Sequence, residues 1–172
     1  MENIISNRIL LAPICMEDTD YIVKWRNNPL VLSNLVVRKP LRKEDHEKWM
    51  RTKVATGEVA QFIIVLRDSE KKIGTVYFRD IDLETRCAEF GIFIGEDDER
   101  GKGYGTDATI AIVKYGFSRL NLHRIFLRVF EDNKHAIRCY KKAGFLQEGL
   151  FRDMVLIDGK YYNMVFMSQL DT

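Results

Sequence analysis

Apolar residues recur with the spacing of helices and strands along the whole chain, and the three prolines all lie before residue 41. Because proline ends helices and central strands, the chain after that point can form uninterrupted elements. Before it, the pattern predicts a strand over 8–13 and a helix that Asp18 caps and that ends before Asn28. A second helix is predicted over 41–56, with Trp49 on its inner side.

Most of the remaining elements have the composition and spacing of strands. They cover 61–67, 72–80, 86–94, 124–129, 145–152 and 160–168. A turn at 68–71 joins the first two of these strands into a hairpin. The strand over 86–94 contains Gly91, and a glycine inside a strand often marks a bulge or a close approach of the backbone. We expect a bulge there to splay this strand from the next one.

Two further helices complete the expected fold. Residues 106–120 are apolar almost all round apart from Asp107, Lys114 and Ser118, so this helix should be largely buried. The other helix starts after a cap at Asp132 or Asn133 and ends at residue 143, where Gly144 follows. The order β-α-α-β-β-β-α-β-α-β-β predicts an α+β domain with a central mixed sheet.

Length and charge narrow the class of protein. The 172 residues suit a single domain over 1–172, and 27 basic against 25 acidic side chains give no general attraction to nucleic acid. No run approaches the ~20 apolar residues of a membrane helix. The first residues also lack the pattern of a secretory signal. We therefore expect a cytoplasmic protein that does not bind nucleic acid or membranes.

The three cysteines lie far apart and form no pair with metal-binding spacing. They are Cys15, Cys87 and Cys139. Neither a CxxC pair nor a Cys/His cluster with zinc spacing is present in the sequence. We expect no metal site, and we expect all three cysteines to be small core residues.

The segment 100–105, Arg-Gly-Lys-Gly-Tyr-Gly, lies between a predicted strand and the apolar helix. Its glycines let the backbone turn sharply and approach a ligand. Main-chain amides in such a loop form a nest for anions, and the helix that follows adds its positive dipole end. Arg100 and Lys102 add charge. This combination suits a pyrophosphate group.

Other phosphate-binding patterns fit this segment less well. Position 106 is threonine, so the dinucleotide pattern G-x-G-x-x-G fails, and the Walker pattern is absent. The acidic run 96–99 should repel a nucleoside triphosphate unless a metal ion lies there. A flexible connection between strand and helix remains the alternative when glycine spacing is considered alone.

The segment resembles the Arg/Gln-x-x-Gly-x-Gly/Ala loop of the GCN5-related N-acetyltransferases, the GNAT superfamily. Arg100, Gly103 and Gly105 stand at the matching positions. The strand over 88–94 is similar to the family's preceding strand. The segment 133–145, Asn-Lys-His-Ala-Ile-Arg-Cys-Tyr-Lys-Lys-Ala-Gly-Phe, is similar to its second motif. The resemblance extends over about residues 8–168.

This resemblance implies the acyl-CoA N-acyltransferase fold, with a mostly antiparallel sheet flanked by helices. It also implies transfer of an acetyl group from acetyl-CoA to a primary amine, by direct attack in a ternary complex. The implied cofactor-binding residues are Ile92, Phe93, Ile94, Arg100, Gly101, Lys102, Gly103, Tyr104, Gly105, Thr106, Asn133 and Lys142. Asn133 matches an asparagine that binds the pantetheine arm, and a helix cap is its alternative role.

Two side chains are the expected catalytic residues. Tyr140 matches the family tyrosine that points at the cofactor sulfur, and a phenol with a pKa near ~10 can donate a proton to the leaving thiolate. Packing on the inner face of its helix is the alternative role. Glu89 is the candidate general base, acting through water, with a structural carboxylate as its alternative. His123 and His135 are expected to be exposed.

Basic residues outnumber acidic ones in the segment that should shape the acceptor pocket. Between residues 24 and 53 three acidic side chains oppose nine basic ones, Lys24, Arg26, Arg38, Lys39, Arg42, Lys43, Lys48, Arg51 and Lys53. A basic rim attracts an anionic acceptor and repels a polycation, although a solvated helix face is the alternative for most of these side chains.

The sequence is similar to three branches of the superfamily and does not distinguish among their acceptors. These are the acetyltransferases of ribosomal-protein N-termini, of spermidine and of nucleotide-linked amino sugars; the segment 25–28, Trp-Arg-Asn-Asn, is similar to the last branch. The expected acceptor is therefore a small-molecule amine or a peptide N-terminus. A homodimer is the oligomeric state considered for this chain. A non-catalytic CoA-binding domain and a nucleotide-binding module are the rival classes, and no G-x-S-x-G motif supports a serine hydrolase.

Overall fold

The computed structural model describes residues 1–171, so Thr172, the last residue of the predicted domain, lies outside them. Within them, one sheet has the strand order β1-β2-β3-β4-β5-β6-β8-β7, and only the β5–β6 pair is parallel. The strands are β1 (Ile4–Ile5), β2 (Ile9–Pro13), β3 (Ala60–Leu66), β4 (Lys72–Asp82), β5 (Cys87–Ile94), β6 (Arg124–Phe130), β7 (Leu146–Ile157) and β8 (Lys160–Leu170). The expected mixed and mostly antiparallel sheet is confirmed.

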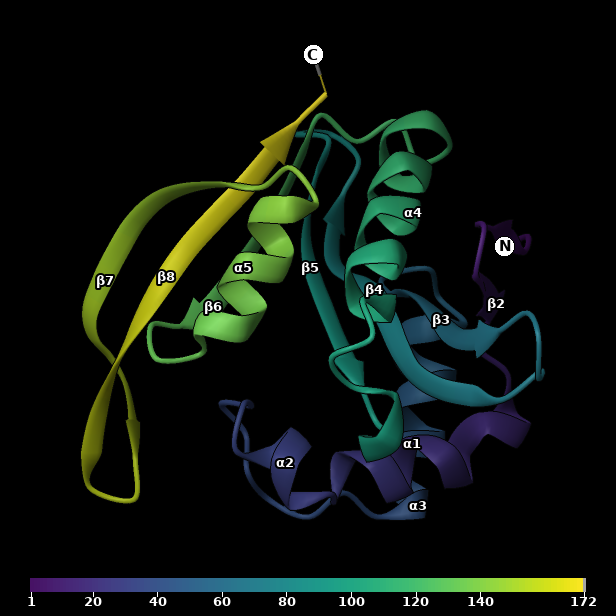
Figure 1. Ribbon diagram of the computed structural model, residues 1–172, viewed down its shortest axis with the longest axis horizontal. Helices are drawn as coiled ribbons and strands as arrows, with labels where there is room; N and C mark the ends of the chain where they lie inside the picture. Colours follow the sequence, from purple (N-terminus) through teal and green to yellow (C-terminus); the bar gives the residue numbers. More distant parts are fainter. Residues whose placement is uncertain (172) are drawn as a thin grey trace.

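Helices cover both faces of this sheet (Figure 1). They are α1 (Thr19–Arg26), α2 (Pro29–Leu32), α3 (Lys43–Trp49), α4 (Tyr104–Ser118) and α5 (Lys134–Lys142). Alternation along β3 shows the two faces directly, because Phe62 and Ile64 join the core beneath α4 and α5 while Ile63 joins the core beneath α1 and α3. The layered α+β architecture follows.

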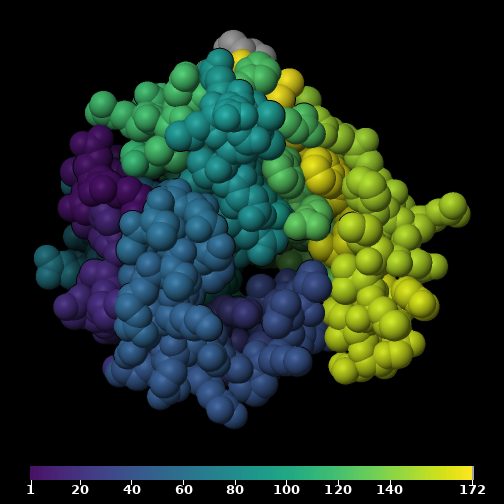
Figure 2. Space-filling model, turned by 180° about the vertical axis from the view of Figure 1, so that it is seen from behind, coloured from purple at the N-terminus to yellow at the C-terminus, as the bar shows by residue number. Residues whose placement is uncertain are grey.

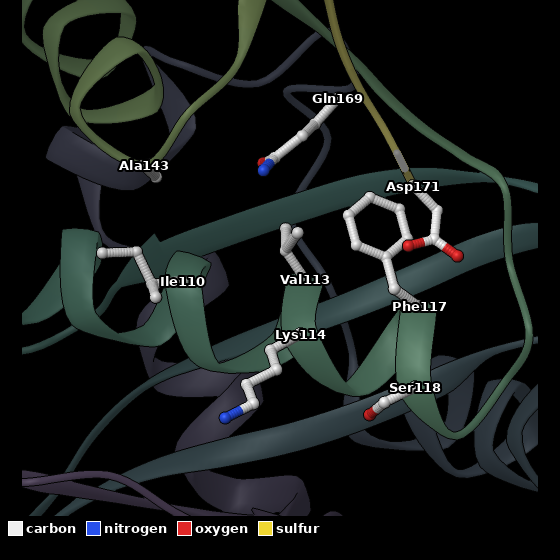
Figure 3. Close-up of a pocket in the computed structure, with 8 residues that line it drawn as sticks. All are labelled: Ile110, Val113, Lys114, Phe117, Ser118, Ala143, Gln169 and Asp171. Carbon is white, nitrogen blue, oxygen red and sulfur yellow. The ribbon is translucent and has the colours of Figure 1, made fainter.

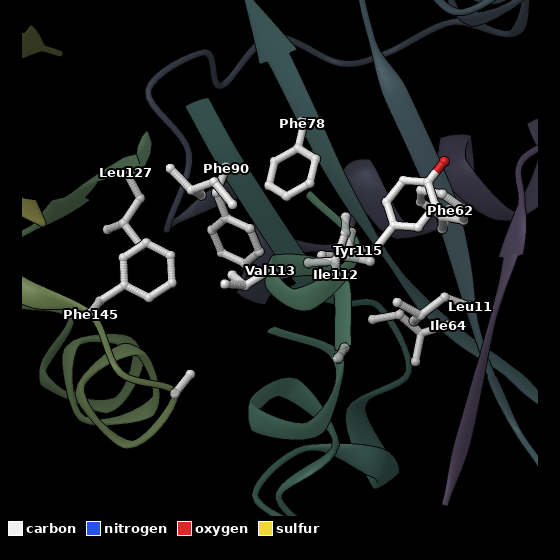
Figure 4. Packing of buried hydrophobic residues seen from close by; sticks show 14 of the residues in the cluster. Leu11, Phe62, Ile64, Phe78, Phe90, Ile112, Val113, Tyr115, Leu127 and Phe145 are labelled. Atoms are coloured by element: carbon white, nitrogen blue, oxygen red, sulfur yellow. The ribbon is translucent and has the colours of Figure 1, made fainter. Parts of the chain in front are cut away.

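The larger core lies between the sheet and helices α4 and α5 (Figure 4). Phe78 of β4 and Phe90 of β5 pack edge to face with ring centroids 6.4 Å apart, and Ile112 of α4 is fully buried. Burial of such side chains contributes roughly 1.5–3 kcal/mol each. This core fixes α4 against the middle of the sheet, which places the glycine loop before it.

Helix α4 is buried along most of its surface, as its sequence predicts. Lys114 and Ser118 are exposed and Asp107 is half-buried, which confirms the polar stripe. Ile110 lies on the same stripe and is 49% exposed. The cysteines differ from the expectation, because Cys15 is exposed and Cys87 and Cys139 are only half-buried.

The segment between α1 and β3 departs most from the predicted elements. Helix α2 was not predicted; Asn28 caps it by accepting a hydrogen bond from the Leu30 N–H, and Pro29 occupies its first position, where a missing N–H costs nothing. Trp49 is 36% exposed rather than turned inward, and His46 and Met50 are the buried residues of that stretch. The helix widens after Trp49 into a turn over Met50–Val54 with i→i+5 hydrogen bonds, which shifts the inner face.

Candidate functional site

Strands β5 and β6 pair over only three residues each and then separate. Cys87–Glu89 pairs with Arg124–Phe126, after which β5 continues along β4 to Ile94 and β6 continues along β8 to Phe130. The inner edges of both strands beyond this point have no strand partner. Main-chain groups on such edges can bind an extended, peptide-like arm as an added strand would. Ile92, Phe93 and Ile94 lie on this edge, as the sequence predicts for pantetheine binding.

The separation of the two strands does not come from a bulge at Gly91. The register between β4 and β5 is continuous around Gly91, and the irregularity lies between Arg79 and Asp82. Gly91 is required for another reason: a Cβ atom there would lie 2.3 Å from the ring of Tyr77. The glycine therefore marks a close approach of the Tyr77 ring to the backbone.

The glycine loop presents main-chain donors at the open end of this gap (Figure 1). Gly101 and Gly103 have φ of 75° and 88°, and Gly103 caps α4. Within residues 1–171, the N–H groups of 101–105 donate to no acceptor, whereas those of Thr106 and Asp107 donate to the Gly103 carbonyl. Free amides at the start of a 15-residue helix form an anion-binding site. The loop thus has the predicted geometry, with the Thr106 amide already engaged.

Arg100 has donors that lack acceptors. Its Nε lies 3.2 Å from Asp97 Oδ1 without hydrogen-bond geometry. Its Nε and Nη2 are buried, and neither has a hydrogen-bond partner in the described part of the chain. Leaving such groups unpaired costs free energy, so this side chain suits a bound anion. The residues of this loop therefore fit the diphosphate of a coenzyme A molecule.

The acidic run before the loop is neutralised rather than repulsive. Glu96 accepts hydrogen bonds from Lys24 and from the indole N–H of Trp25. Glu99 accepts hydrogen bonds from Lys71 and Lys102 at 2.8 and 2.9 Å. This pairing weakens the repulsion of a nucleoside triphosphate that the sequence predicts for this run. The pairing also means that Lys102 contributes less free positive charge than its sequence position indicates.

Arg8 braces the loop, and the sequence pattern did not single it out. Its Nε donates to Asp107 Oδ2 at 2.7 Å and its Nη1 donates to the Lys102 carbonyl at 3.0 Å. Its guanidinium also lies 4.8 Å from the centroid of the Tyr104 ring. No sequence signal connects residue 8 to residues 102–107, because the packing of α4 against β2 brings them together.

Tyr140 lies on α5 beside the gap. Its ring packs edge to face against Phe90, with centroids 5.8 Å apart, so Tyr140 does pack on the inner face of its helix. Its hydroxyl has no hydrogen-bond partner within 1–171. Burial raises the pKa of Tyr140, and the neighbouring Cys139 and Tyr77 raise it further. The phenol is therefore protonated at neutral pH and free to donate.

Asn133 caps α5, and its side chain makes two hydrogen bonds. Its Oδ1 accepts from the Ala136 N–H at 3.1 Å, and its Nδ2 donates to Asn34 Oδ1 at 2.8 Å. The second bond ties α5 to the segment after α2. Lys142 is exposed at the other end of α5. Contact of either side chain with the cofactor stays a prediction.

Glu89 is enclosed by two arginines at the vertex of the gap. Its carboxylate is 5% exposed and accepts from Arg128 Nε and Nη2 at 3.0 and 2.8 Å. Arg79 Nε donates to the same carboxylate at 3.1 Å. Burial raises the pKa of Glu89, but the hydrogen bonds and charges of Arg128 and Arg79 outweigh it, so the pKa lies below the usual carboxyl value.

This environment disfavours the predicted role of Glu89 as a general base. A base must accept a proton near neutral pH, and a carboxylate with a lowered pKa and occupied lone pairs does so poorly. The structural alternative fits the geometry better. His123 and His135 are exposed, as expected.

The face opposite α4 and α5 is hollowed. Figure 2 shows the depression between the blue segment that follows α3, the indigo segment around α2 and the yellow-green β7–β8 hairpin. By the register of β4 and β5, Tyr77, Arg79 and Glu89 alternate with core residues and therefore face this side. An acceptor that enters here reaches the gap from the side opposite Tyr140.

A separate cavity of about 410 Å³ lies along the C-terminal half of α4 (Figure 3). It is lined by Ile110, Val113, Lys114, Phe117, Ser118, Ala143, Gln169 and Asp171. It is far along α4 from the glycine loop and contains none of the predicted site residues. In the part of the chain that the structure describes, no helix is long and apolar enough to cross a membrane, and no group of metal-binding side chains gathers.

Comparison with known protein families and proteins finds acetyltransferases. Residues 8–146 match the model of the acetyltransferase (GNAT) domain. The chain is 31% identical to spermidine N(1)-acetyltransferase of Escherichia coli over 94% of this chain and 86% of that protein. It is 28% identical to the N-acetyltransferase p20 of Bacillus licheniformis, over 99% and 97%.

Solved structures show the same likeness. Spermidine N-acetyltransferase from Vibrio cholerae, in complex with CoA and spermine, superposes with a TM-score of 0.88 and 26% identity, over 96% of each chain. A dodecameric structure of that enzyme superposes with a TM-score of 0.82 and 25% identity, over 96% of this chain and 95% of the other.

Proposed function

This chain belongs to the GNAT acetyltransferase family and transfers an acetyl group from acetyl-CoA to a primary amine; from that premise we propose which of its residues carry out the transfer. The amides of residues 101–105 and the guanidinium of Arg100 bind the diphosphate. The free edge of β5 from Ile92 to Ile94 holds the pantetheine arm beside Tyr140. The observation that carries this assignment is the set of unused amides at the open end of the β5–β6 gap.

Bound acetyl-CoA supplies the acetyl group and a thiolate leaving group. As the amine nitrogen bonds to the carbonyl carbon and the carbon–sulfur bond breaks, Tyr140 donates a hydrogen bond to the departing sulfur. A thiol has a pKa near ~8.5, so its thiolate is less basic than a phenolate and does not take the proton of the phenol fully. The phenol therefore stabilises the developing negative charge by its hydrogen bond, and solvent completes the protonation of the sulfur. The protons lost by the amine also go to solvent.

Deprotonation of the amine is assigned to water rather than to Glu89. An alkylammonium has a pKa of ~10.4, so only a small fraction of such an acceptor is neutral at pH 7. The two arginines beside Glu89 raise the local positive potential, which favours the neutral form of a bound amine. In this proposal Glu89 positions Arg79 and Arg128.

Acetyl-CoA binding is the test of the proposed function. At about 100 times its Kd, acetyl-CoA should stabilise the fold by ~2.7 kcal/mol. For a chain of this length that corresponds to a rise in Tm of roughly 5–10 °C. Gly103→Val should bind CoA at least tenfold more weakly in calorimetry, because a β-branched residue at φ 88° costs about 1–2 kcal/mol and reshapes the amide nest.

Gly57→Val is the matched control for that variant. Gly57 also has a positive φ of 82°, and a Cβ atom there would meet nothing within 4 Å. It should lose similar stability and keep its affinity for CoA. Equal affinity of the Gly103→Val variant and the wild-type protein would remove the loop from the cofactor site.

The edge strand β7 is proposed as a surface for self-association. Its exposed apolar side chains are Leu146, Leu150, Phe151, Met154 and Leu156, each at least 43% exposed. Exposed apolar side chains along a sheet edge indicate an interface. We expect sedimentation velocity to show at least a dimer, and Leu156→Lys to dissociate it. Ile5→Lys, on the opposite edge of the sheet, should not, and a monomeric wild-type protein would refute the surface.

A further inference from the structure

Arg26 is a half-buried cation without a counter-ion. It is the last residue of α1, and within residues 1–171 no carboxylate lies within ion-pair distance of its guanidinium. It makes no hydrogen bond to any described side chain or carbonyl group. Burial lowers the pKa of Arg26, which reports the cost of removing this charge from water. An anion that bound beside Arg26 would offset this cost, because a buried charge is costly unless it is paired.

The surroundings of Arg26 place it beside the acceptor side of the gap. Helix α1 packs against β4, whose residues Tyr77 and Arg79 face the same side of the sheet. The charges of Arg79 and Arg26 both lower the pKa of the buried Tyr77 phenol, which burial itself raises, so both guanidiniums lie near this phenol. Helix α1 packs on this side of the sheet, so Arg26 lies on the side that carries the hollow seen in Figure 2.

The floor of this hollow carries two arginines besides Arg26. Arg79 and Arg128 share the buried carboxylate of Glu89, and the exposed Asp80 lies 3.9 Å from Arg79. Both arginine side chains remain about 40% exposed, at 42% and 38%. A polycation that enters the hollow meets repulsion, whereas an anion meets three guanidinium groups. Guanidinium binds phosphate and carboxylate groups through paired N–H donors.

We infer that the acceptor is a small amine that also carries a phosphate or carboxylate group, and that Arg26 binds this anionic group. The inference rests on the proposed function, because it assigns the acceptor side of that same site. It also separates this chain from the relatives named for spermidine, an acceptor without any anionic group. A nucleotide-linked amino sugar and an amino acid-like amine both satisfy the chemistry.

The test compares amines that differ only in an anionic group. With the loop filled by saturating CoA, glucosamine 6-phosphate should raise the Tm further, and glucosamine and spermidine should not. The rate of thiol release from acetyl-CoA should be measured for the same amines and for a second pair, β-alanine and its amide. In each pair that reacts, the anionic amine should have at least tenfold higher kcat/KM, and this preference should shrink at 0.5 M salt.

Arg26→Gln identifies the residue responsible. It should lower kcat/KM for the anionic amine about 10- to 100-fold, mainly through KM, and leave CoA affinity unchanged. Its own Tm should equal or exceed that of the wild-type protein, since an unpaired half-buried charge is removed. Lys24→Gln on the same helix is the control, because Lys24 is exposed and pairs with Glu96 outside the hollow.

Three results would overturn the inference. The first is a preference for spermidine or for the neutral amine of each pair. The second is that Arg26→Gln and the wild-type protein have equal kinetics. The third is that the Tm of Arg26→Gln is several degrees below that of the wild-type protein, which would show a structural role for Arg26. Absence of any stabilisation by CoA would instead refute the proposed function. The two failures are therefore distinguishable.

Discussion

Replacing Tyr140 with phenylalanine is expected to lower kcat at least 100-fold while the affinity for acetyl-CoA changes less than threefold. A positioned hydrogen-bond donor that stabilises charge developing in the transition state contributes about 10²–10³-fold to kcat. The packing of the ring against Phe90 survives in the variant, because phenylalanine retains the edge-to-face contact. The measurement is steady-state thiol release, together with calorimetric titration of CoA.

Two further phenylalanine substitutions show whether the effect belongs to this hydroxyl. Tyr77 lies on the opposite face of the sheet near the same gap, so Tyr77→Phe tests whether the other phenol is the donor. Tyr115 packs against Phe62 in the core, with ring centroids 5.4 Å apart, and Tyr115→Phe controls for loss of a remote hydroxyl. A Tyr140→Phe enzyme with near-normal kcat would exclude this tyrosine from the chemistry.

Replacing Glu89 with glutamine is expected to destabilise the fold strongly. Removing one partner of a buried ion pair costs about 3–5 kcal/mol, and we expect ~2–3 kcal/mol here because both guanidiniums are partly exposed to water. For a chain of this length that lowers Tm by roughly 4–12 °C. Denaturant unfolding of the two proteins measures the difference in the free energy of unfolding.

Glu148→Gln is the matched control, because Glu148 also pairs with an arginine, Arg124, but is 39% exposed. Exposed pairs contribute ~0–1 kcal/mol, so this variant should lose little stability. If Glu89 were the general base, Glu89→Gln would lose nearly all turnover at temperatures where it is folded. We expect it to retain at least a tenth of the wild-type kcat there, and a loss exceeding 100-fold would restore the base role.

The pairing of Glu89 with Arg79 and Arg128 predicts how the stability of the fold depends on pH. The pKa of Glu89 is lower in the folded protein than in the unfolded chain, so the unfolded state binds a proton first as pH falls. The stability that Glu89 contributes is therefore fully present above the ordinary carboxyl pKa and is lost as pH falls through the lower, folded value. The stability difference between the wild-type protein and Glu89→Gln should shrink over that acidic range.

The sequence by itself predicted the elements whose patterns are local. Short runs rich in apolar residues located the strands from β3 to β6, and the loop 100–105 was identified because glycine spacing and a following helix are both visible along the chain. The cap at Asn133 also follows from neighbouring residues, since its Oδ1 bonds an N–H three positions later. Helix α2 was missed because its four residues are too short for a periodic signal.

Only the tertiary structure decided the roles of charged side chains. Glu89 looks like a free carboxylate in the sequence, and it becomes a paired one because β4 and β6 flank β5 and bring Arg79 and Arg128 to both sides of it. Arg26 looks like one basic residue among nine, and it is distinguished by being half-buried without a partner among the described residues. Electrostatic pairing depends on distances of a few ångströms between residues far apart in the chain, and strand register, rather than local sequence, sets those distances.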